Sequence, residues 1–386
     1  MKIALVIERM DVSRGGRETS TAQVAAGLAG RSHAVTILCR TSSWRHEAVQ
    51  ICRLGERGLL RAVRLRNFIA DVQKTIRRRQ FDVVHAMLPV PGANVYQLRG
   101  GTSPGRFIAG LRRRSRLGAA VARLVAPLNL HRMATARTER LVVEDHRVLC
   151  LPVSEMIAEE LHRHYGRAEG EGVRVIYNAV EVPETDAEQR LNHRRRLRGE
   201  LGLKDDETMF LTVAKNFELK GVAEAIAAFA QWLKGRDDRP GGKLVVIGRQ
   251  AVGKYRHLAV RRGVGDCVVF VPPVEDVFPW YAAADVCVLL SWYDPCSRVA
   301  LEATRWGVPS ITTVYNGAAE VLAAGAGVVV GSPKDLKAVV AAMEELADPR
   351  RRSLRADACR NLADRLSMKR HVDELIAAYG EILEKC

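Results

Sequence analysis

Two lysines, Lys215 and Lys220, stand five positions apart, and Gly221 follows the second. Lysine ammonium groups bind phosphate oxygens as compact point charges, so two of them in one loop could hold a diphosphate. The apolar run at 209–214 precedes the pair, and a helical pattern at 222–233 follows it. The pattern indicates a strand-to-helix loop able to bind a diphosphate. Solvated surface lysines are the alternative.

Two carboxylates, Asp294 and Glu302, stand eight positions apart in an otherwise apolar stretch. Asp294 follows an apolar run, and Glu302 falls one to two turns into the next helical pattern. The residues between them would present the backbone amides of a helix N-terminus, which favour an anion. These residues include Cys296, Ser297, Arg298 and Val299. The arrangement favours a ligand site, and a helix-start acid with a solvated Glu302 is the alternative.

Paired glycines, Gly15 and Gly16, lie between the apolar run at 3–7 and a helical pattern at 19–28. Glycine lets the backbone approach a ligand closely, and the start of a helix offers free N–H groups to an anion. An ordinary turn would look the same. The dinucleotide fingerprint GxGxxG is absent, which counts against a nicotinamide cofactor.

The apolar runs that precede these residues belong to two sets, and helical patterns separate one run from the next. Continuous apolar runs are typical of strands buried on both faces of a parallel sheet. The runs lie at 3–7, 34–38, 83–84 and 148–153, and then at 209–214, 244–247, 267–271, 286–290, 310–313 and 327–330. We therefore expect an α/β fold with two Rossmann-like domains, at 1–179 and 180–366, facing across a cleft. The stretch 367–386 should form an amphipathic helix that packs back on the first domain.

Composition agrees with two folded domains. The chain has 386 residues, 47% of them hydrophobic and 27% charged, which excludes a disordered, collagen-like or disulfide-scaffold protein. Its eight cysteines are unclustered and form no CxxC pair, so we expect reduced thiols and no metal site. No run of 18 apolar residues is present.

The net charge of +16 favours a polyanionic neighbour, and half of it comes from 106–138, which has eight arginines and no acidic residue. At helical spacing this stretch predicts one basic amphipathic helix, broken near Pro127. Such helices lie on anionic membranes. The expected membrane contacts are Arg112, Arg113, Arg116 and Arg123. A solvated face of a packed helix is the alternative, whereas 5% aromatic residues and no stacking motif count against nucleic acid.

Taken together, these motifs resemble the family 4 glycosyltransferases, which have the two-domain GT-B fold. The family has two glutamates separated by seven residues, and this chain has Asp294 and Glu302 at that spacing. The family also has an arginine five positions before a Lys-Gly pair, and this chain has Lys215 five positions before Lys220-Gly221. The family's Gly-Gly corresponds to Gly15-Gly16, and its Pro-Asn-Gly-Val-Asp corresponds to Tyr-Asn-Ala-Val-Glu at 177–181. Within the family, the pattern is most similar to the lipopolysaccharide-core glucosyltransferases. Those enzymes have an acid in the Pro-Gly-x-acid-Val-Tyr segment where this chain has Asn94.

The resemblance implies a retaining, metal-independent hexosyltransferase without a cofactor. The donor would be a nucleotide diphosphate sugar such as UDP-glucose, and the acceptor a lipopolysaccharide-core or other lipid-linked glycan. Lys215 and Lys220 would stabilise the leaving phosphate, and Asp294 would contact the donor sugar. Glu302 would bind the ribose, with Gly15, Gly16 and the 296–299 amides nearby.

His85, at a strand end, could touch the donor sugar, although a core histidine fits equally, and Asn94 could contact sugar or acceptor. The enzyme would be cytoplasmic and peripheral on the inner face of the membrane. A non-catalytic relative that binds nucleotide sugars, a nucleotide-sugar epimerase and a basic nucleic-acid-binding protein are the alternatives.

Overall fold

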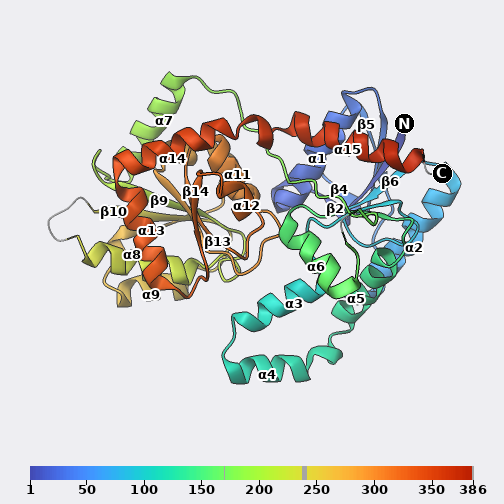
Figure 1. The fold of residues 1–386 in the computed structure, drawn as a ribbon, viewed down its shortest axis with the longest axis horizontal. Coiled ribbons are helices and arrows are strands. Elements are labelled where there is room, and N and C mark those ends of the chain that lie inside the picture. The colour runs from blue at the N-terminus through green and yellow to red at the C-terminus, as the bar shows by residue number, and fades with distance from the viewer. Residues whose placement is uncertain (169, 237–240, 385–386) are drawn as a thin grey trace. The chain divides into compact units, whose positions relative to one another are not determined.

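The computed structural model describes residues 1–168, 170–236 and 241–384 (Figure 1). The chain divides into two compact units, one of Met1–Ala179 with Ser367–Cys386 and the other of Val180–Leu366. Each unit is built on a six-stranded sheet in which every pairing is parallel. The prediction of two Rossmann-like α/β domains is therefore confirmed.

The sheet of the first unit has the strand order β5-β3-β1-β6-β7-β8. The strands are β1 Lys2–Val6, β3 Ala34–Cys39, β5 Val49–Arg53, β6 Val83–Ala86, β7 Val95–Gln97 and β8 Leu149–Leu151, and a separate pair joins β2 Arg9–Met10 to β4 Thr41–Ser42. Alternate residues of β1 belong to two different hydrophobic clusters. Ile3 and Leu5 lie in one cluster, and Ala4 and Val6 lie in the other. Both faces of this sheet are therefore covered, as a buried parallel sheet requires.

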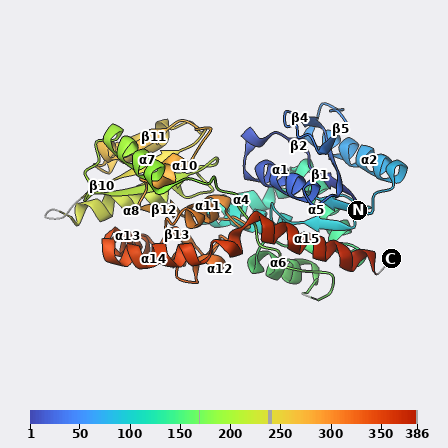
Figure 2. The ribbon, with the colours of Figure 1, turned by 90° about the horizontal axis from the view of Figure 1, so that it is seen from above.

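The helices of the first unit include the C-terminal one. They are η1 Val12–Arg14, α1 Gly16–Ala29, α2 Arg61–Arg79, α6 Glu155–Tyr165 and α15 Met368–Leu383. Figures 1 and 2 show α15 running beside α1. A Cβ on Gly27 of α1 would lie 2.8 Å from a methyl carbon of Val372, so this glycine permits the close approach of the two helices. Val372, Leu375 and Tyr379 are fully buried in the same cluster as β1.

The basic stretch forms a helical excursion of the first unit. Its elements are α3 Ser103–Arg112, α4 Arg116–Leu124, η2 Ala126–Leu128 and α5 Leu130–Val143. The prediction of a single helix broken near Pro127 is wrong, because the chain also breaks at 113–115. There Ser115 caps a new helix by accepting a hydrogen bond from the Gly118 N–H at 3.2 Å. Within the described ranges, no helix is both long and apolar enough to cross a bilayer.

The sheet of the second unit has the order β11-β10-β9-β12-β13-β14. Its strands are β9 Thr208–Val213, β10 Gly242–Ile247, β11 Val268–Val271, β12 Val286–Leu289, β13 Ser310–Thr313 and β14 Gly327–Val330. Its helices are α7 Ala187–Glu200, α8 Val222–Lys234, α9 Gly253–Arg261, η3 Gly265–Cys267, α10 Phe278–Ala283, α11 Arg298–Arg305, α12 Ala319–Leu322, α13 Leu336–Ala347, α14 Pro349–Asn361 and η4 Asp364–Leu366. Strand β9 is flanked by β10 and β12, so the loops after β9, β12 and β13 come close together at one edge of the sheet.

Candidate functional site

The loops that follow β12 and β13 are joined by backbone hydrogen bonds. The Asp294 N–H donates to the carbonyl of Tyr315 at 2.9 Å, and the Gly317 N–H donates to the carbonyl of Asp294 at 2.9 Å. The Trp292 N–H donates to the carbonyl of Leu219 at 2.9 Å, which ties the loop after β9 to the same group. The structure thus brings the two predicted loops of the second unit, after β9 and β12, into one cluster with the loop after β13.

Lys220 and Asp294 form an ion pair in this cluster. Only 18% of the Lys220 side chain and 13% of the Asp294 side chain are exposed. Partial removal of water strengthens the attraction between the two charges relative to a surface pair. The pair therefore places a cation and a carboxylate, from two different strand ends, at one point of the sheet edge.

The backbone conformation and close packing at position 221 explain why a glycine follows Lys220. The φ of Gly221 is +66°, which glycine adopts more easily than other residues. A Cβ at this position would also lie 2.1 Å from the carbonyl oxygen of Leu290. Glycine here lets the loop after β9 lie against the end of β12, which brings Lys220 within reach of Asp294.

Asn316 positions the start of α11. Its Oδ1 accepts hydrogen bonds from the N–H groups of Ser297 and Ala318, each at 3.1 Å, and its Nδ2 donates to Thr312 Oγ1 at 2.9 Å. The Ser297 N–H, predicted to face a donor, is thus engaged within the protein. Cys296 and Ser297 are buried, whereas Arg298 and Val299 are partly buried. We had not predicted Asn316 as a site residue, although its place after a strand and before Gly317 was a usable signal.

Glu302 is largely buried on α11, so the alternative of a solvated glutamate is wrong. Arg298 Nη2 lies 3.3 Å from its Oε1, and the Tyr281 hydroxyl donates to its Oε2 at 3.3 Å. Burial raises the pKa of Glu302, while the charge of Arg298 and the Tyr281 hydrogen bond oppose that rise. The carboxylate is held in a fixed orientation by two neighbours, as a ligand-binding acid requires.

The remaining predicted donor residues lie in two places. Lys215 is exposed, in the same loop as Lys220. Gly15 and Gly16 lie in the first unit, where Gly15 caps α1 with φ +145° and Gly16 is the first residue of that helix. The φ of Gly15 favours glycine, which accounts for this part of the motif.

His85 and Asn94 both make structural contacts in the first unit. His85 is fully buried, with its Nδ1 2.6 Å from the hydroxyl of Tyr379, and burial with the nearby Arg99 lowers its pKa to about 3. Asn94 accepts a hydrogen bond from the Val84 N–H at 2.7 Å and donates to the carbonyl of Asp82 at 3.2 Å. Of the two interpretations of His85, the core histidine matches this environment.

The predicted membrane arginines are divided between α3 and α4. Arg112 ends α3, Arg113 follows it, and Arg116 and Arg123 lie on α4. The apolar side chains of α4 are uncovered, with 82% of Leu117 and 81% of Leu124 exposed. Helix α4 therefore carries both arginines and exposed apolar side chains.

Comparisons with known proteins agree with this architecture. A model of "Glycosyltransferase Family 4" matches residues 14–183, and one of "Glycosyl transferases group 1" matches residues 207–349. The lipopolysaccharide glucosyltransferase WaaG of Escherichia coli K12 is 24% identical over 323 residues, which cover 83% of this chain and 82% of that protein.

Solved structures show the same fold. The crystal structure of WaaG, a glycosyltransferase involved in lipopolysaccharide biosynthesis, matches with a TM-score of 0.81 and 22% identity over 97% of this chain and 98% of its own. Anabaena HepE in complex with UDP-glucose matches with a TM-score of 0.69 and 18% identity over 98% of this chain and 100% of its own. Both family models describe glycosyltransferases and match successive parts of the chain, and with the structural match to WaaG they identify this protein as a glycosyltransferase with the GT-B fold.

Proposed function

We propose that this glycosyltransferase moves a hexose from a nucleotide diphosphate sugar, with UDP-glucose as the leading donor, to a lipid-linked glycan of the lipopolysaccharide-core type. The observation that carries the proposal is the cluster of Lys220, Asp294 and Glu302 at one sheet edge of the second unit. The Lys220–Asp294 ion pair, with Glu302 on the helix that follows the loop of Asp294, suits a ligand that has phosphates at one end and hydroxyl groups at the other.

The donor contacts follow from the chemistry of each group. Lys220, assisted by Lys215, would bind the diphosphate, and Glu302 would accept hydrogen bonds from the ribose hydroxyls. Asp294 would accept hydrogen bonds from hydroxyls of the donor sugar. The complex of the similar protein HepE with UDP-glucose supports this class of donor.

The transfer step needs no cofactor and no metal in this proposal. The bond between the anomeric carbon and the diphosphate oxygen breaks, and an acceptor oxygen forms the new bond on the same face of the sugar. The proton of the acceptor hydroxyl passes to the departing phosphate. The Lys220 ammonium stabilises the negative charge that grows on the leaving group, which is the electrostatic part of catalysis.

The acceptor side of the proposal rests on α4. Its arginines attract anionic headgroups, and its exposed leucines can enter the boundary between headgroups and acyl chains. An enzyme held this way at the inner face of the cytoplasmic membrane would meet lipid-linked acceptors there. The similar protein WaaG is named a lipopolysaccharide glucosyltransferase, which supports an acceptor of this class.

A ligand panel tests the proposal. The melting temperature of the protein should rise with a UDP-sugar more than with GDP- or ADP-sugars, and much less with an oligonucleotide. Mass spectrometry should then show a hexose transferred from that donor to a glycolipid acceptor. A rise with no transfer to any acceptor would favour a non-catalytic binding protein, and a rise with the oligonucleotide alone would overturn the proposal.

A further inference from the structure

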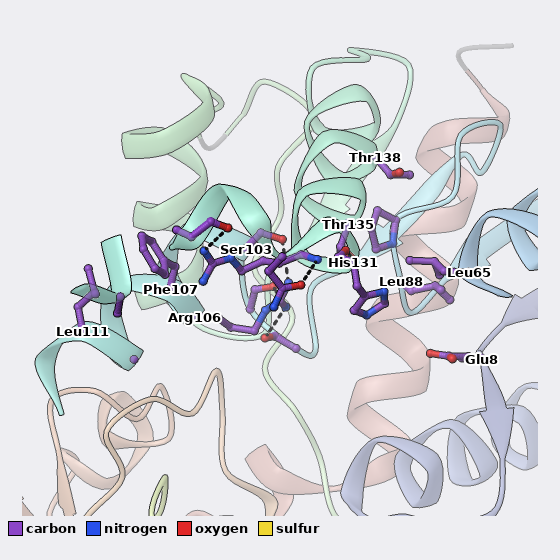
Figure 3. A pocket seen from close by; sticks show the side chains of 18 of the residues that line it. Glu8, Leu65, Leu88, Ser103, Arg106, Phe107, Leu111, His131, Thr135 and Thr138 are labelled. Carbon is purple, nitrogen blue, oxygen red and sulfur yellow. Dashed lines mark hydrogen bonds between the residues drawn. The ribbon is translucent and has the colours of Figure 1, made fainter. Parts of the chain in front are cut away.

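A cavity of about 590 Å³ lies within the first unit, beneath the helical excursion. It is bounded by the loop after β6, at Met87, Leu88 and Pro89, and by side chains of α3, α4 and α5. Figure 3 shows Phe107 and Leu111 on one side of the cavity and Leu65 and Leu88 on the other. It shares no residue with the cluster around Lys220 and Asp294.

Arg132, on α5, is held firmly at the wall of this cavity. Its guanidinium carbon lies 4.2 Å from the ring centroid of Phe107, and its Nη2 donates to the carbonyl of Ala126 at 3.0 Å. The stack and the hydrogen bond fix the planar group before any ligand arrives, which lowers the entropy lost on binding. Arg132 is thus preorganised and retains further N–H donors.

The positive charge of this wall is not balanced by acidic side chains among the described residues. No carboxylate in the part of the chain that the structure describes lies within 4.0 Å of the guanidinium of Arg132 or of Arg114, which also lines the cavity. The other charged groups of the wall have partners. Arg106 lies 3.4 Å from the buried Glu139, and Glu8 pairs with Arg40 at 2.8 Å. The surplus charge therefore comes from Arg114 and Arg132.

Glu139 keeps this arrangement in place. It is fully buried and accepts hydrogen bonds from the Ser103 N–H at 2.7 Å, the Ser103 hydroxyl at 2.8 Å and the Tyr165 hydroxyl at 2.6 Å. These bonds fix the start of α3, on which Arg106 and Phe107 stand. The cavity wall is therefore built by buried polar contacts as well as by surface helices.

Part of the cavity lining is apolar and belongs to α4, whose apolar side chains are exposed. Val121 and Val125 line the cavity, while Leu124 of the same helix is 81% exposed. A neighbouring cavity of about 520 Å³ shares Val125, Asn129 and His131 with it and reaches Leu128, which is 78% exposed. A ligand in the cavity could thus be polar and anionic at one end and apolar at the other.

We propose that this cavity binds the acceptor and that the acceptor saccharide carries a phosphate or carboxylate group, which Arg132 and Arg114 bind. The proposal rests on the function proposed above and adds the chemical class of the acceptor. Arginine suits such a group because its fork of N–H donors matches two oxygen atoms at once. The apolar wall by Val121 and Val125 takes the part of the acceptor nearest its lipid.

Calorimetric titration tests this proposal with glucose 6-phosphate and neutral glucose as probes. Saturating UDP is present, so that the proposed donor site is filled. Glucose 6-phosphate should bind at least about tenfold more tightly than glucose, and Arg132→Gln should remove about tenfold of that affinity. Arg132→Lys should fall between the two, because it keeps the charge but not the fork. Arg114→Gln, a change at an exposed position, should also weaken binding.

Arg78→Gln is the matched control, because Arg78 is exposed on α2 of the same unit and does not line the cavity. It should leave the affinity unchanged. Equal binding of the two sugars, or unchanged binding by both Arg132→Gln and Arg114→Gln, would overturn the proposal. The proposal would also be overturned if the arginine substitutions weakened only the binding to phosphatidylglycerol vesicles, because that result would assign these arginines to lipid headgroups.

Failure of the proposed function would look different. In that case UDP-glucose would neither bind nor be consumed, while the arginine-dependent binding of glucose 6-phosphate persisted. If instead the wild type transferred glucose to neutral and phosphorylated acceptors equally well, the function would stand and the acceptor class proposed here would be wrong.

Discussion

The ammonium of Lys220 and the carboxylate of Asp294, 74 positions apart in the chain, form an ion pair at the sheet edge of the second unit. Hydrogen bonds between the three loops hold the two residues together before any donor is present. A diphosphate that binds Lys220 must therefore compete with, or share, the carboxylate of Asp294. The two side chains should act as a unit and not as independent contacts.

Asp294→Asn should lower kcat far more than it weakens UDP binding, because the nucleotide part of the site is left intact. Asp294→Glu keeps the charge and should retain much more activity than Asp294→Asn. Combining Asp294→Asn with Lys220→Met should give a coupling free energy of about 1 kcal/mol or more. Steady-state kinetics of the four proteins in the cycle measure it. Strictly additive effects would show that Asp294 and Lys220 do not act as a unit. Lost UDP binding with a normal kcat would show that Asp294 does not contact the donor sugar.

Transfer activity should survive EDTA, because Lys215 and Lys220 supply the positive charge that a metal would otherwise bring to the diphosphate. The rate of sugar transfer is measured before and after chelation and dialysis. Complete loss on chelation, with recovery on adding Mn²⁺ or Mg²⁺, would contradict the metal-free mechanism.

Acid should destabilise the first unit through two buried histidines. Burial, together with nearby Arg99, lowers the pKa of His85 to about 3 and that of His371 well below its usual value. Between about pH 6.5 and these lower values the unfolded chain binds protons that the folded chain does not, so the free energy of unfolding falls as the pH falls. Each residue contributes up to about 1.4 kcal/mol per pH unit in that window.

Urea unfolding from pH 7.5 to pH 4.5 measures this dependence. His371 binds the carbonyl of Tyr177 at 2.8 Å, so His371→Asn should be less stable at pH 7.5 but lose less stability on acidification. His162→Asn, on the exposed face of α6, is the control and should keep the wild-type slope. Identical slopes in all three proteins would exclude His371 as a source of the acid sensitivity.

Vesicle binding should depend on the basic residues of α3 and α4. Each basic side chain near an anionic surface contributes about 1 kcal/mol, so changing Arg112, Arg113, Arg116 and Arg123 to Gln should weaken binding by orders of magnitude. High salt should act in the same direction, because it screens the attraction. Co-sedimentation with phosphatidylglycerol vesicles at low and high salt checks both effects. Equal sedimentation of wild type and quadruple variant would exclude these arginines as membrane contacts.

Most strands could be predicted because both sheets are parallel and buried on both faces, so that strands such as β1 and β9 are continuous apolar runs. Two strands of the first sheet were missed. Strand β5 contains the polar residues Gln50 and Arg53, and β7 has only three residues. The break between α3 and α4 was missed because the apolar spacing continues through it. The local signal was Ser115, a good N-cap residue, which the helical periodicity obscured.

The candidate site was predictable only in part. Residue type and position after a strand singled out Lys220, Asp294 and Glu302, but not how they are paired. The contact of Glu302 with Tyr281, 21 positions away, depends on how α10 packs against α11. Arg132 was one of eight arginines in its stretch, and only the stack on Phe107 in the folded unit distinguishes it.

The rate of sugar transfer by Lys220→Ala shows whether Lys220 stabilises the departing diphosphate. The variant should bind its glycolipid acceptor normally but lose about 2–4 kcal/mol of transition-state stabilisation, a fall in rate of roughly 30- to 900-fold. Lys337→Ala, which removes an exposed lysine from α13 of the same unit, should transfer at the wild-type rate. The measurement is the single-turnover rate of glucose transfer from UDP-glucose. An unchanged rate in Lys220→Ala would contradict the placing of the diphosphate at this sheet edge.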